Sequence, residues 1–155
     1  MSTDMTWQML STSSEQTEQL AEAIGTKLRG SEVIELVSDL GGGKTTFTRG
    51  LARGARSTDN VASPTFTISR EYTCPHFKIA HFDFYRLGEA GIVADELAEV
   101  IGDPEYVTVV EWGEIVHDVL PAERCTITIT QTATGDRDIV CTYAAKYAYL
   151  FEEIQ

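Results

Sequence analysis

The chain of 155 residues carries 12 lysines and arginines against 24 aspartates and glutamates, giving a net charge of −12. A protein that binds nucleic acid by itself needs a basic surface, so the net negative charge argues against a nucleic-acid-binding protein. The same charge suits binding to a protein partner that carries a basic surface. A hydrophobic content of 43% and a charged content of 23% are ordinary for a globular domain, and we expect a single domain over residues 1–155.

Cysteine usage and hydropathy indicate the compartment. Cys74, Cys125 and Cys141 are odd in number and form no C-x-x-C pair, which is typical of reduced thiols in a cytosol. Residues 1–10 lack the basic-then-apolar order of a secretory signal, and no apolar run reaches membrane-spanning length. The sequence therefore predicts a cytoplasmic protein without a membrane partner.

The first third of the chain predicts a strand, a helix, a second strand and a second helix. Capping-box patterns precede the first helix, whose apolar residues recur every four positions. A β-branched run forms the second strand, and a glycine-rich turn leads directly into the second helix. These elements are expected at residues 6–10, 15–29, 32–37 and 45–53, with Gly30 and Gly54 ending the two helices.

The remainder predicts an antiparallel hairpin, a helix, a continuously apolar strand, a weak helix, a second hairpin and a last amphipathic helix. Strands are expected at 66–73, 78–85, 106–110, 124–131 and 137–143, and helices at 90–101, at 114–120 and through Tyr147, Leu150, Phe151 and Ile154. Helices mixed with buried strands predict an α/β fold, with a sheet covered on both faces, and the hairpins make that sheet mixed.

A phosphate-binding loop is predicted where the second strand meets its helix. Residues 38–46 read S-D-L-G-G-G-K-T-T and end in Gly43-Lys44-Thr45, as in G-x-x-x-x-G-K-[ST], with Ser38 at the first glycine position. Glycines let successive N–H groups point at phosphate oxygens, and the helix N-terminus adds further donors. Lys44 supplies a mobile cation and the Thr45 hydroxyl is placed to ligate Mg²⁺. A glycine turn that binds nothing is the alternative.

Two carboxylates lie at the ends of other predicted strands, Asp83 after His81-Phe82 and Glu111 before Trp112. Ligands of open α/β sheets lie at the carboxyl ends of the strands. One carboxylate there can supply an oxygen ligand to Mg²⁺ near Thr45, and the other can orient an attacking water. Each alone is equally well interpreted as a capping or solvated carboxylate.

Four segments, in a fixed order, resemble the bacterial tRNA threonylcarbamoyladenosine biosynthesis ATPases, the TsaE (YjeE) family. They are Asp39–Gly50, Val61–Thr67, His81–Leu87 and Val109–Trp112, within a resemblance that covers roughly Ser13–Gly113. The resemblance implies a three-layer P-loop NTPase-like fold, with a mixed, mostly parallel sheet flanked by helices and carrying antiparallel hairpins. The C-terminal third carries little of the family pattern.

The resemblance also implies an ATPase with slow turnover that uses ATP and Mg²⁺. The family acts with a TsaD/TsaB-like complex that transfers a threonylcarbamoyl group to adenosine 37 of ANN-decoding tRNAs, so tRNA is an indirect partner. In family terms Thr45 and Glu111 hold the metal, and Lys44, Asp83 and Glu111 serve hydrolysis. The implied nucleotide-binding residues are Leu40, Gly41, Gly42, Gly43, Lys44, Thr45, Thr46, Thr65 and Trp112.

Two further segments receive roles from the resemblance. Ser63-Pro64-Thr65 resembles a switch that responds to the γ-phosphate, and the helix start at Ser14–Thr17 approaches the base.

Other functions remain open on the residues alone. A small-molecule phosphotransferase would use the same loop, but it needs an arginine-bearing lid, and the arginines at hand are not grouped as one. A nucleotide-gated binding module with negligible catalysis is best supported by Ser38. A GTPase is disfavoured because no N-K-x-D segment occurs. Cys74, His76 and His81 could be imagined as zinc ligands, but no fourth ligand is evident.

Overall fold

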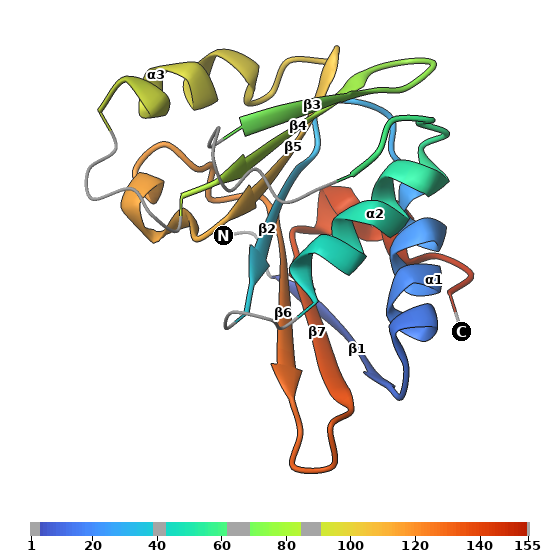
Figure 1. The fold of residues 1–155 in the computed structure, drawn as a ribbon. Helices are drawn as coiled ribbons and strands as arrows, with labels where there is room; N and C mark the ends of the chain where they lie inside the picture. Colours follow the sequence, from blue (N-terminus) through green and yellow to red (C-terminus); the bar gives the residue numbers. More distant parts are fainter. Residues whose placement is uncertain (1–3, 39–42, 62–68, 85–90, 155) are drawn as a thin grey trace.

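The computed structural model describes residues 4–38, 43–61, 69–84 and 91–154, apart from the side chains of residues 92, 93, 113 and 115 (Figure 1). The strands are β1 (Met5–Ser11), β2 (Val33–Val37), β3 (Ser69–Thr73), β4 (Lys78–Asp83), β5 (Tyr106–Glu111), β6 (Cys125–Gln131) and β7 (Arg137–Tyr143). The α-helices are α1 (Ser14–Gly25), α2 (Lys44–Gly54) and α3 (Gly91–Val100), and the 3₁₀ helices are η1 (Gly113–Val116) and η2 (Ala145–Phe151).

All seven strands form one sheet in the order β1-β7-β6-β2-β5-β4-β3. The four central strands β6, β2, β5 and β4 run parallel to one another. Antiparallel pairs extend both sides of this core, β6–β7 and β7–β1 on one side and β4–β3 on the other. The expected mixed α/β sheet with a parallel centre and two hairpins is therefore confirmed.

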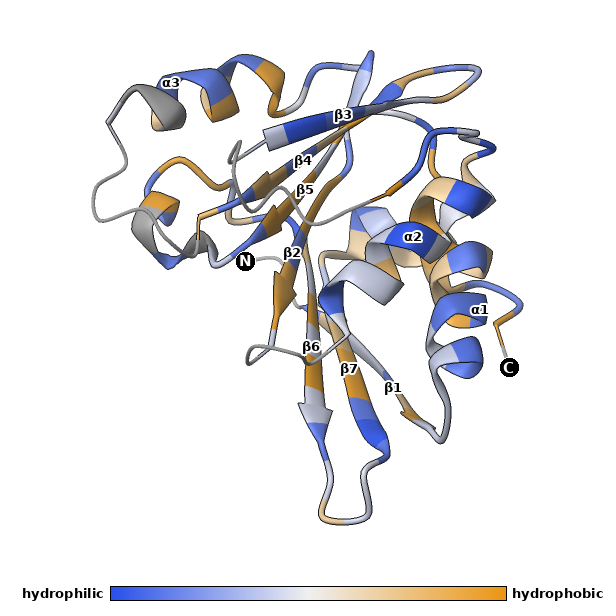
Figure 2. Ribbon diagram, viewed as in Figure 1, coloured by the Kyte–Doolittle hydropathy of each residue, from blue (hydrophilic) through white to orange (hydrophobic). Residues whose placement is uncertain are grey.

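Helices cover the sheet on opposite faces, as Figure 1 shows. Alternate residues of the central strands point to the two sides, so Val109 joins the core beneath α1 and α2 while Val110 joins the core beneath α3. In Figure 2 the hydrophobic colour runs along much of β2 and β5, which lie at the centre of the sheet and contribute residues to the apolar cores on both faces. This gives the three layers that the resemblance implied.

Helices α1 and α2 touch through their backbones. A Cβ atom on Gly54 would lie 2.1 Å from the carbonyl oxygen of Glu22, and one on Gly25 would lie 2.3 Å from that of Leu51. Gly50 makes a third such approach, 2.4 Å from the Glu18 carbonyl oxygen. Only glycine allows this spacing, so the three glycines fix how α2 lies against its neighbour.

Helix α1 is shorter than the pattern of apolar residues suggested, because it ends at Gly25 instead of residue 29. The backbone N–H groups of Arg29 and Gly30 donate to the Glu32 carboxylate at 2.7 Å each, and a longer helix would need these donors for its own ladder. Leu28 is still buried, at the end of a tight turn. Glu32 also accepts a hydrogen bond from the Tyr149 hydroxyl at 2.5 Å, which joins this turn to η2.

The C-terminal helices are also tighter than expected. The segment predicted at 114–120 forms only the short 3₁₀ helix η1, and the last helix is 3₁₀ as well and ends at Phe151. Tyr147, Leu150 and Phe151 are buried as their spacing predicted. Residues 66–68 and 85, the outer ends of two predicted strands, lie outside the described residues.

Candidate functional site

Three parallel strands end at one edge of the sheet. In the ladder, Leu36 of β2 pairs with Glu111 of β5, and Glu111 pairs with Asp83 of β4. The exit of β2 toward the glycine-rich loop therefore lies beside the end of β5 that carries Glu111, and the end of β4 that carries Asp83 is one strand further away. The geometric expectation that these remote pieces of chain meet at a common edge is confirmed for the described residues.

The loop enters α2 through a residue with a left-handed backbone. Gly43 caps the helix with φ 101° and ψ 15°, a conformation in which glycine is strongly favoured. The first intrahelical bond runs from Phe47 N to Gly43 O, and the amides before Phe47 belong to the turn whose donors a helix cannot satisfy itself. Such a helix start binds anions. Leu40, Gly41 and Gly42 lie outside the described residues.

Lys44 bridges the start of α2 and the two neighbouring strands. Its side chain is buried, its Nζ donates to the Ser38 carbonyl oxygen at 3.1 Å, and the same atom lies 4.8 Å from the centre of the Trp112 ring. Trp112 follows β5 directly and has a left-handed backbone with φ 57° and ψ 48°, which is costly for a residue with a side chain. The ammonium group thus lies where β2, β5 and α2 converge.

Glu111 is the most deeply buried of the candidate acidic residues, at 2% exposure. Its Oε2 lies 2.5 Å from His81 Nε2, and the other ring nitrogen of His81 lies 3.2 Å from the Tyr72 hydroxyl. Neither His81 nor Tyr72 was assigned to the site from the sequence. The available signal was strand alternation, which places His81 on the same face of β4 as Asp83.

Of the remaining predicted residues, Asp83, Thr45 and Thr46 lie in the described part of the chain. Asp83 is half-buried at the end of β4, and the following amide, Phe84 N, continues the ladder to Glu111 O at 3.1 Å. Thr45 and Thr46 are half-buried in the first turn of α2. Thr65 lies outside the described residues.

The oxygen donors at this edge suit a magnesium ion shared with a phosphate. Within the described part of the chain, no three histidine, cysteine, aspartate or glutamate side chains gather closely enough to form a metal site of their own. Mg²⁺ usually takes only one or two protein ligands beside waters and phosphate oxygens. The Thr45 hydroxyl and the Glu111 carboxylate are a donor set of that kind.

A zinc site receives no support from the described residues. Burial raises the pKa of the Cys74 thiol to about 11, with a smaller contribution from the charge of Asp59. Burial also raises the pKa of Cys141 to about 12. Both ring nitrogens of His81 are already taken, one by Glu111 and the other by Tyr72, which leaves none for a zinc ion in this arrangement.

A polar cavity of about 380 Å³ adjoins the loop-to-helix junction. The start of α1, the start of α2 and the β6–β7 hairpin line it, through Ser11, Thr12, Ser13, Ser14, Thr17, Gly43, Thr46, Gly135 and Arg137. The segment Ser14–Thr17 therefore lies across this cavity from Gly43 and Thr46 at the start of α2. Hydroxyl and guanidinium groups at the wall can hydrogen-bond to a sugar or a base.

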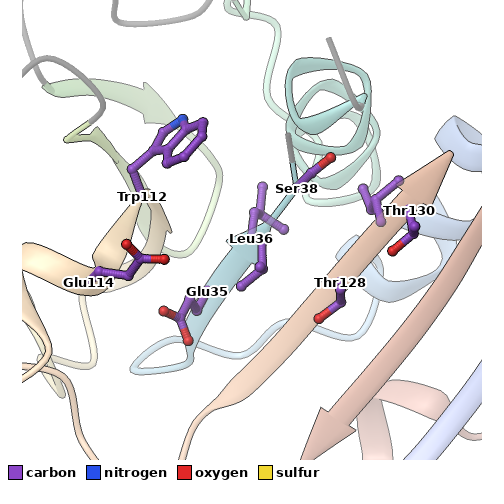
Figure 3. Close-up of a pocket in the computed structure, with 9 residues that line it drawn as sticks. Glu35, Leu36, Ser38, Trp112, Glu114, Thr128 and Thr130 are labelled. Carbon is purple, nitrogen blue, oxygen red and sulfur yellow. The ribbon is translucent and has the colours of Figure 1, made fainter. Parts of the chain in front are cut away.

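A second cavity, of about 230 Å³, lies on the other side of the β2 exit. Figure 3 shows Trp112 and Glu114 on one wall and Thr128 and Thr130 on the other, with β2 between them. Glu35 on its floor is paired with Arg124 at 3.0 Å. The Glu114 carboxylate on the wall disfavours a phosphate, so this cavity suits an anion less well than the Gly43–Thr46 side of the edge does.

The family model described as "Threonylcarbamoyl adenosine biosynthesis protein TsaE" matches residues 11–139. The chain belongs to the TsaE family. Among TsaE relatives, the "tRNA threonylcarbamoyladenosine biosynthesis protein TsaE" of Bacillus subtilis is 36% identical over 146 residues, which cover 90% of this chain and 88% of that protein. The protein of the same name from Aquifex aeolicus is 42% identical over 104 residues, covering 66% of this chain and 73% of the relative.

A solved structure supports the TsaE fold directly. The crystal structure of YdiB from Bacillus subtilis superposes with a TM-score of 0.76 at 32% identity and covers 99% of this chain and 95% of that one. Among the described helices, none is both long and apolar enough to cross a lipid bilayer.

Proposed function

We propose that this TsaE-family chain binds ATP with Mg²⁺ at the Gly43–Thr46 edge and hydrolyses it slowly. This activity would support the threonylcarbamoylation of adenosine 37 in ANN-decoding tRNAs. The observation that carries the proposal is the convergence of a glycine-capped helix start, Lys44 and the strand ends bearing Asp83 and Glu111. The names of the relatives supply the pathway.

Each group has a task that follows from its chemistry. Lys44 and the first amides of α2 bind the β- and γ-phosphates, and Thr45 with Glu111 would hold the metal. When bound, Mg²⁺ supplies positive charge that neutralises the phosphate oxygens as the terminal bond breaks. Asp83 orients and deprotonates the attacking water. Leu40, Gly41, Gly42 and Thr65 complete the nucleotide contacts in this proposal.

The polar cavity between α1 and the loop suits the remainder of the nucleotide. It begins at Gly43 and Thr46, where the phosphates would lie, and extends to the start of α1 and to Arg137. We assign the ribose and the base to it.

The partners in this proposal are the subunits of a TsaD/TsaB-like threonylcarbamoyl-transferase, in the cytoplasm. The net charge of −12 suits a protein that works on other subunits while one of them holds the tRNA.

Nucleotide binding is expected to change the fluorescence of Trp112. The Lys44 ammonium lies 4.8 Å from its ring and would move to the phosphates when ATP binds. The chain has two tryptophans, and the other, Trp7, packs against Phe151. A Trp7→Phe variant isolates the Trp112 signal, and a titration with MgATP should give a saturable change. A Trp112→Phe variant should lose that change, and a response that persists there would contradict the assignment.

The Asp83→Asn variant is expected to separate hydrolysis from binding. Loss of the base should lower the hydrolysis rate by on the order of 100-fold or more, since general-base catalysis contributes about that much. The dissociation constant of MgATP should change less than about threefold because Asp83 is not assigned to the nucleotide itself. Single-turnover hydrolysis and the Trp112 titration measure the two quantities. Asp95→Asn, at an exposed position of α3, is the matched control.

The pathway is tested in cells depleted of their own TsaE-family protein. The wild-type chain should restore threonylcarbamoyladenosine in tRNA, measured by mass spectrometry of nucleosides, and Asp83→Asn should not. Full restoration by Asp83→Asn would favour a nucleotide-gated binding module. Phosphate transfer to a small metabolite well above the rate of hydrolysis would favour a phosphotransferase.

A further inference from the structure

Three polar side chains from neighbouring strands form a line beneath the candidate nucleotide edge. Tyr72 lies on β3, His81 on β4 and Glu111 on β5, and their exposed fractions are 2%, 0% and 2%. Cross-strand pairing sets Tyr72 opposite Ile79 and His81 opposite Val109, so each hydrogen bond in the line is a diagonal contact to the next strand. The line ends at the carboxylate assigned to the metal.

The chemistry of the atoms fixes part of the hydrogen-bond order. A carboxylate that binds a metal can only accept hydrogen bonds, so in this role Glu111 Oε2 accepts from His81 Nε2, which lies 2.5 Å away. The Tyr72 hydroxyl, 3.2 Å from His81 Nδ1, satisfies the far side of the ring as either donor or acceptor. Both rotation and displacement of the imidazole are therefore restrained from two sides.

Burial of three polar side chains in a line costs free energy, and this cost is expected only where a specific side-chain orientation is required. The neighbouring positions on this face, Ile79 and Val109, are fully buried and apolar, and an apolar side chain at 81 would fit this pattern. Buried polar groups lose hydration, and the loss is offset only by well-formed bonds. A buried carboxylate with one oxygen held by a histidine has its other oxygen in a defined direction.

We propose that His81 is a positioning residue that holds Glu111 Oε2 so that Oε1 is presented to the metal, with Tyr72 holding His81 in place. The inference rests on the proposed function, because it deepens the role given there to Glu111. Partners behind a metal ligand typically change metal affinity by about 10–100-fold when they are removed.

The test measures Mg²⁺-dependent nucleotide binding without turnover. The affinity for a non-hydrolysable ATP analogue is determined for each variant in Mg²⁺ and in EDTA, and the ratio of the two affinities is the readout. His81→Leu should lower this ratio by at least about tenfold and leave the affinity in EDTA nearly unchanged. His81→Gln, whose side-chain amide can donate from the place of Nε2, should recover most of the ratio. Tyr72→Phe should fall between His81→Leu and the wild type.

The outcomes distinguish the metal role of Glu111 from the positioning role of His81. A wild-type chain without any gain from Mg²⁺ would overturn the metal role of Glu111 and the inference with it. If Mg²⁺ raises the nucleotide affinity of the wild type and raises that of His81→Leu by the same factor, only the inference about His81 is overturned. Equal losses in Mg²⁺ and EDTA, with no rescue by His81→Gln, would show a purely structural histidine. If His81→Leu does not fold, the test uses Tyr72→Phe, which removes a single hydroxyl. A ratio of affinities in Mg²⁺ and EDTA that is unchanged in Tyr72→Phe would then overturn the inference.

Discussion

Replacement of Lys44 by alanine should weaken ATP binding by at least about 100-fold. The Lys44 side chain is buried at the junction of α2 with the ends of β2 and β5, and no surrounding water can substitute fully for its ammonium. A charge-assisted hydrogen bond to phosphate is worth about 1.5–3 kcal/mol, and Lys44 is assigned to two phosphate groups. Calorimetric titration with MgATP measures the loss, and cells that carry only this variant should lack threonylcarbamoyladenosine.

The control for this loss lies at the other end of the sheet. Lys78 is exposed at the N-terminal end of β4, so Lys78→Ala removes the same charge far from the proposed site. Its affinity for MgATP should match that of the wild type. Thermal unfolding of both variants distinguishes a binding defect from a folding defect. Unchanged tRNA modification in cells that carry Lys44→Ala would defeat the proposed function.

The Gly54→Ala variant should lose about 2–4 kcal/mol of the free energy of unfolding. The added Cβ would lie 2.1 Å from the carbonyl oxygen of Glu22 and 2.9 Å from the Cα of Gly25, both backbone atoms of α1 that cannot rotate away. Separation of the helices costs more than the roughly 1 kcal/mol of helix propensity that alanine gains over glycine. At about 2–4 °C per kcal/mol, the midpoint of thermal unfolding should fall by about 5–15 °C.

Arg49→Ala provides the matched control on the same helix. Its side chain is exposed on α2, so alanine there should alter the free energy of unfolding by no more than about 0.5 kcal/mol. Calorimetric scans of the two variants and the wild type make the comparison. A Gly54→Ala midpoint equal to that of Arg49→Ala would mean that the two helices separate at no cost.

Local sequence patterns predicted helices and strands well where the structure depends only on neighbouring residues. The β-branched run before Ser38 and the glycine-rich turn after it require no distant partner to be recognised, and the strand–loop–helix unit follows. The meeting of Asp83 and Glu111 was predictable as well, because parallel strands place their carboxyl ends at one edge.

What local patterns missed depends on contacts between distant residues. The end of α1 is set by Glu32, whose carboxylate takes the amides of Arg29 and Gly30. The line from Tyr72 through His81 to Glu111 depends on the register of three strands, and register does not follow from the alternation within any one of them. The roles given to Leu40, Gly41, Gly42 and Thr65 stay predictions, since these residues lie outside the described part of the chain.

The place of β2 in the sheet determines when the proposed nucleotide-binding edge can form during synthesis of the chain. Its parallel neighbours are β5, which ends at Glu111, and β6, which starts at Cys125. A nascent chain must therefore emerge well past residue 125 before the strand that carries the loop gains both flanks. Pairings between such remote segments form slowly, because a long loop has to close first. The strand that leads into the loop is thus made early but gains its second neighbour only late in synthesis.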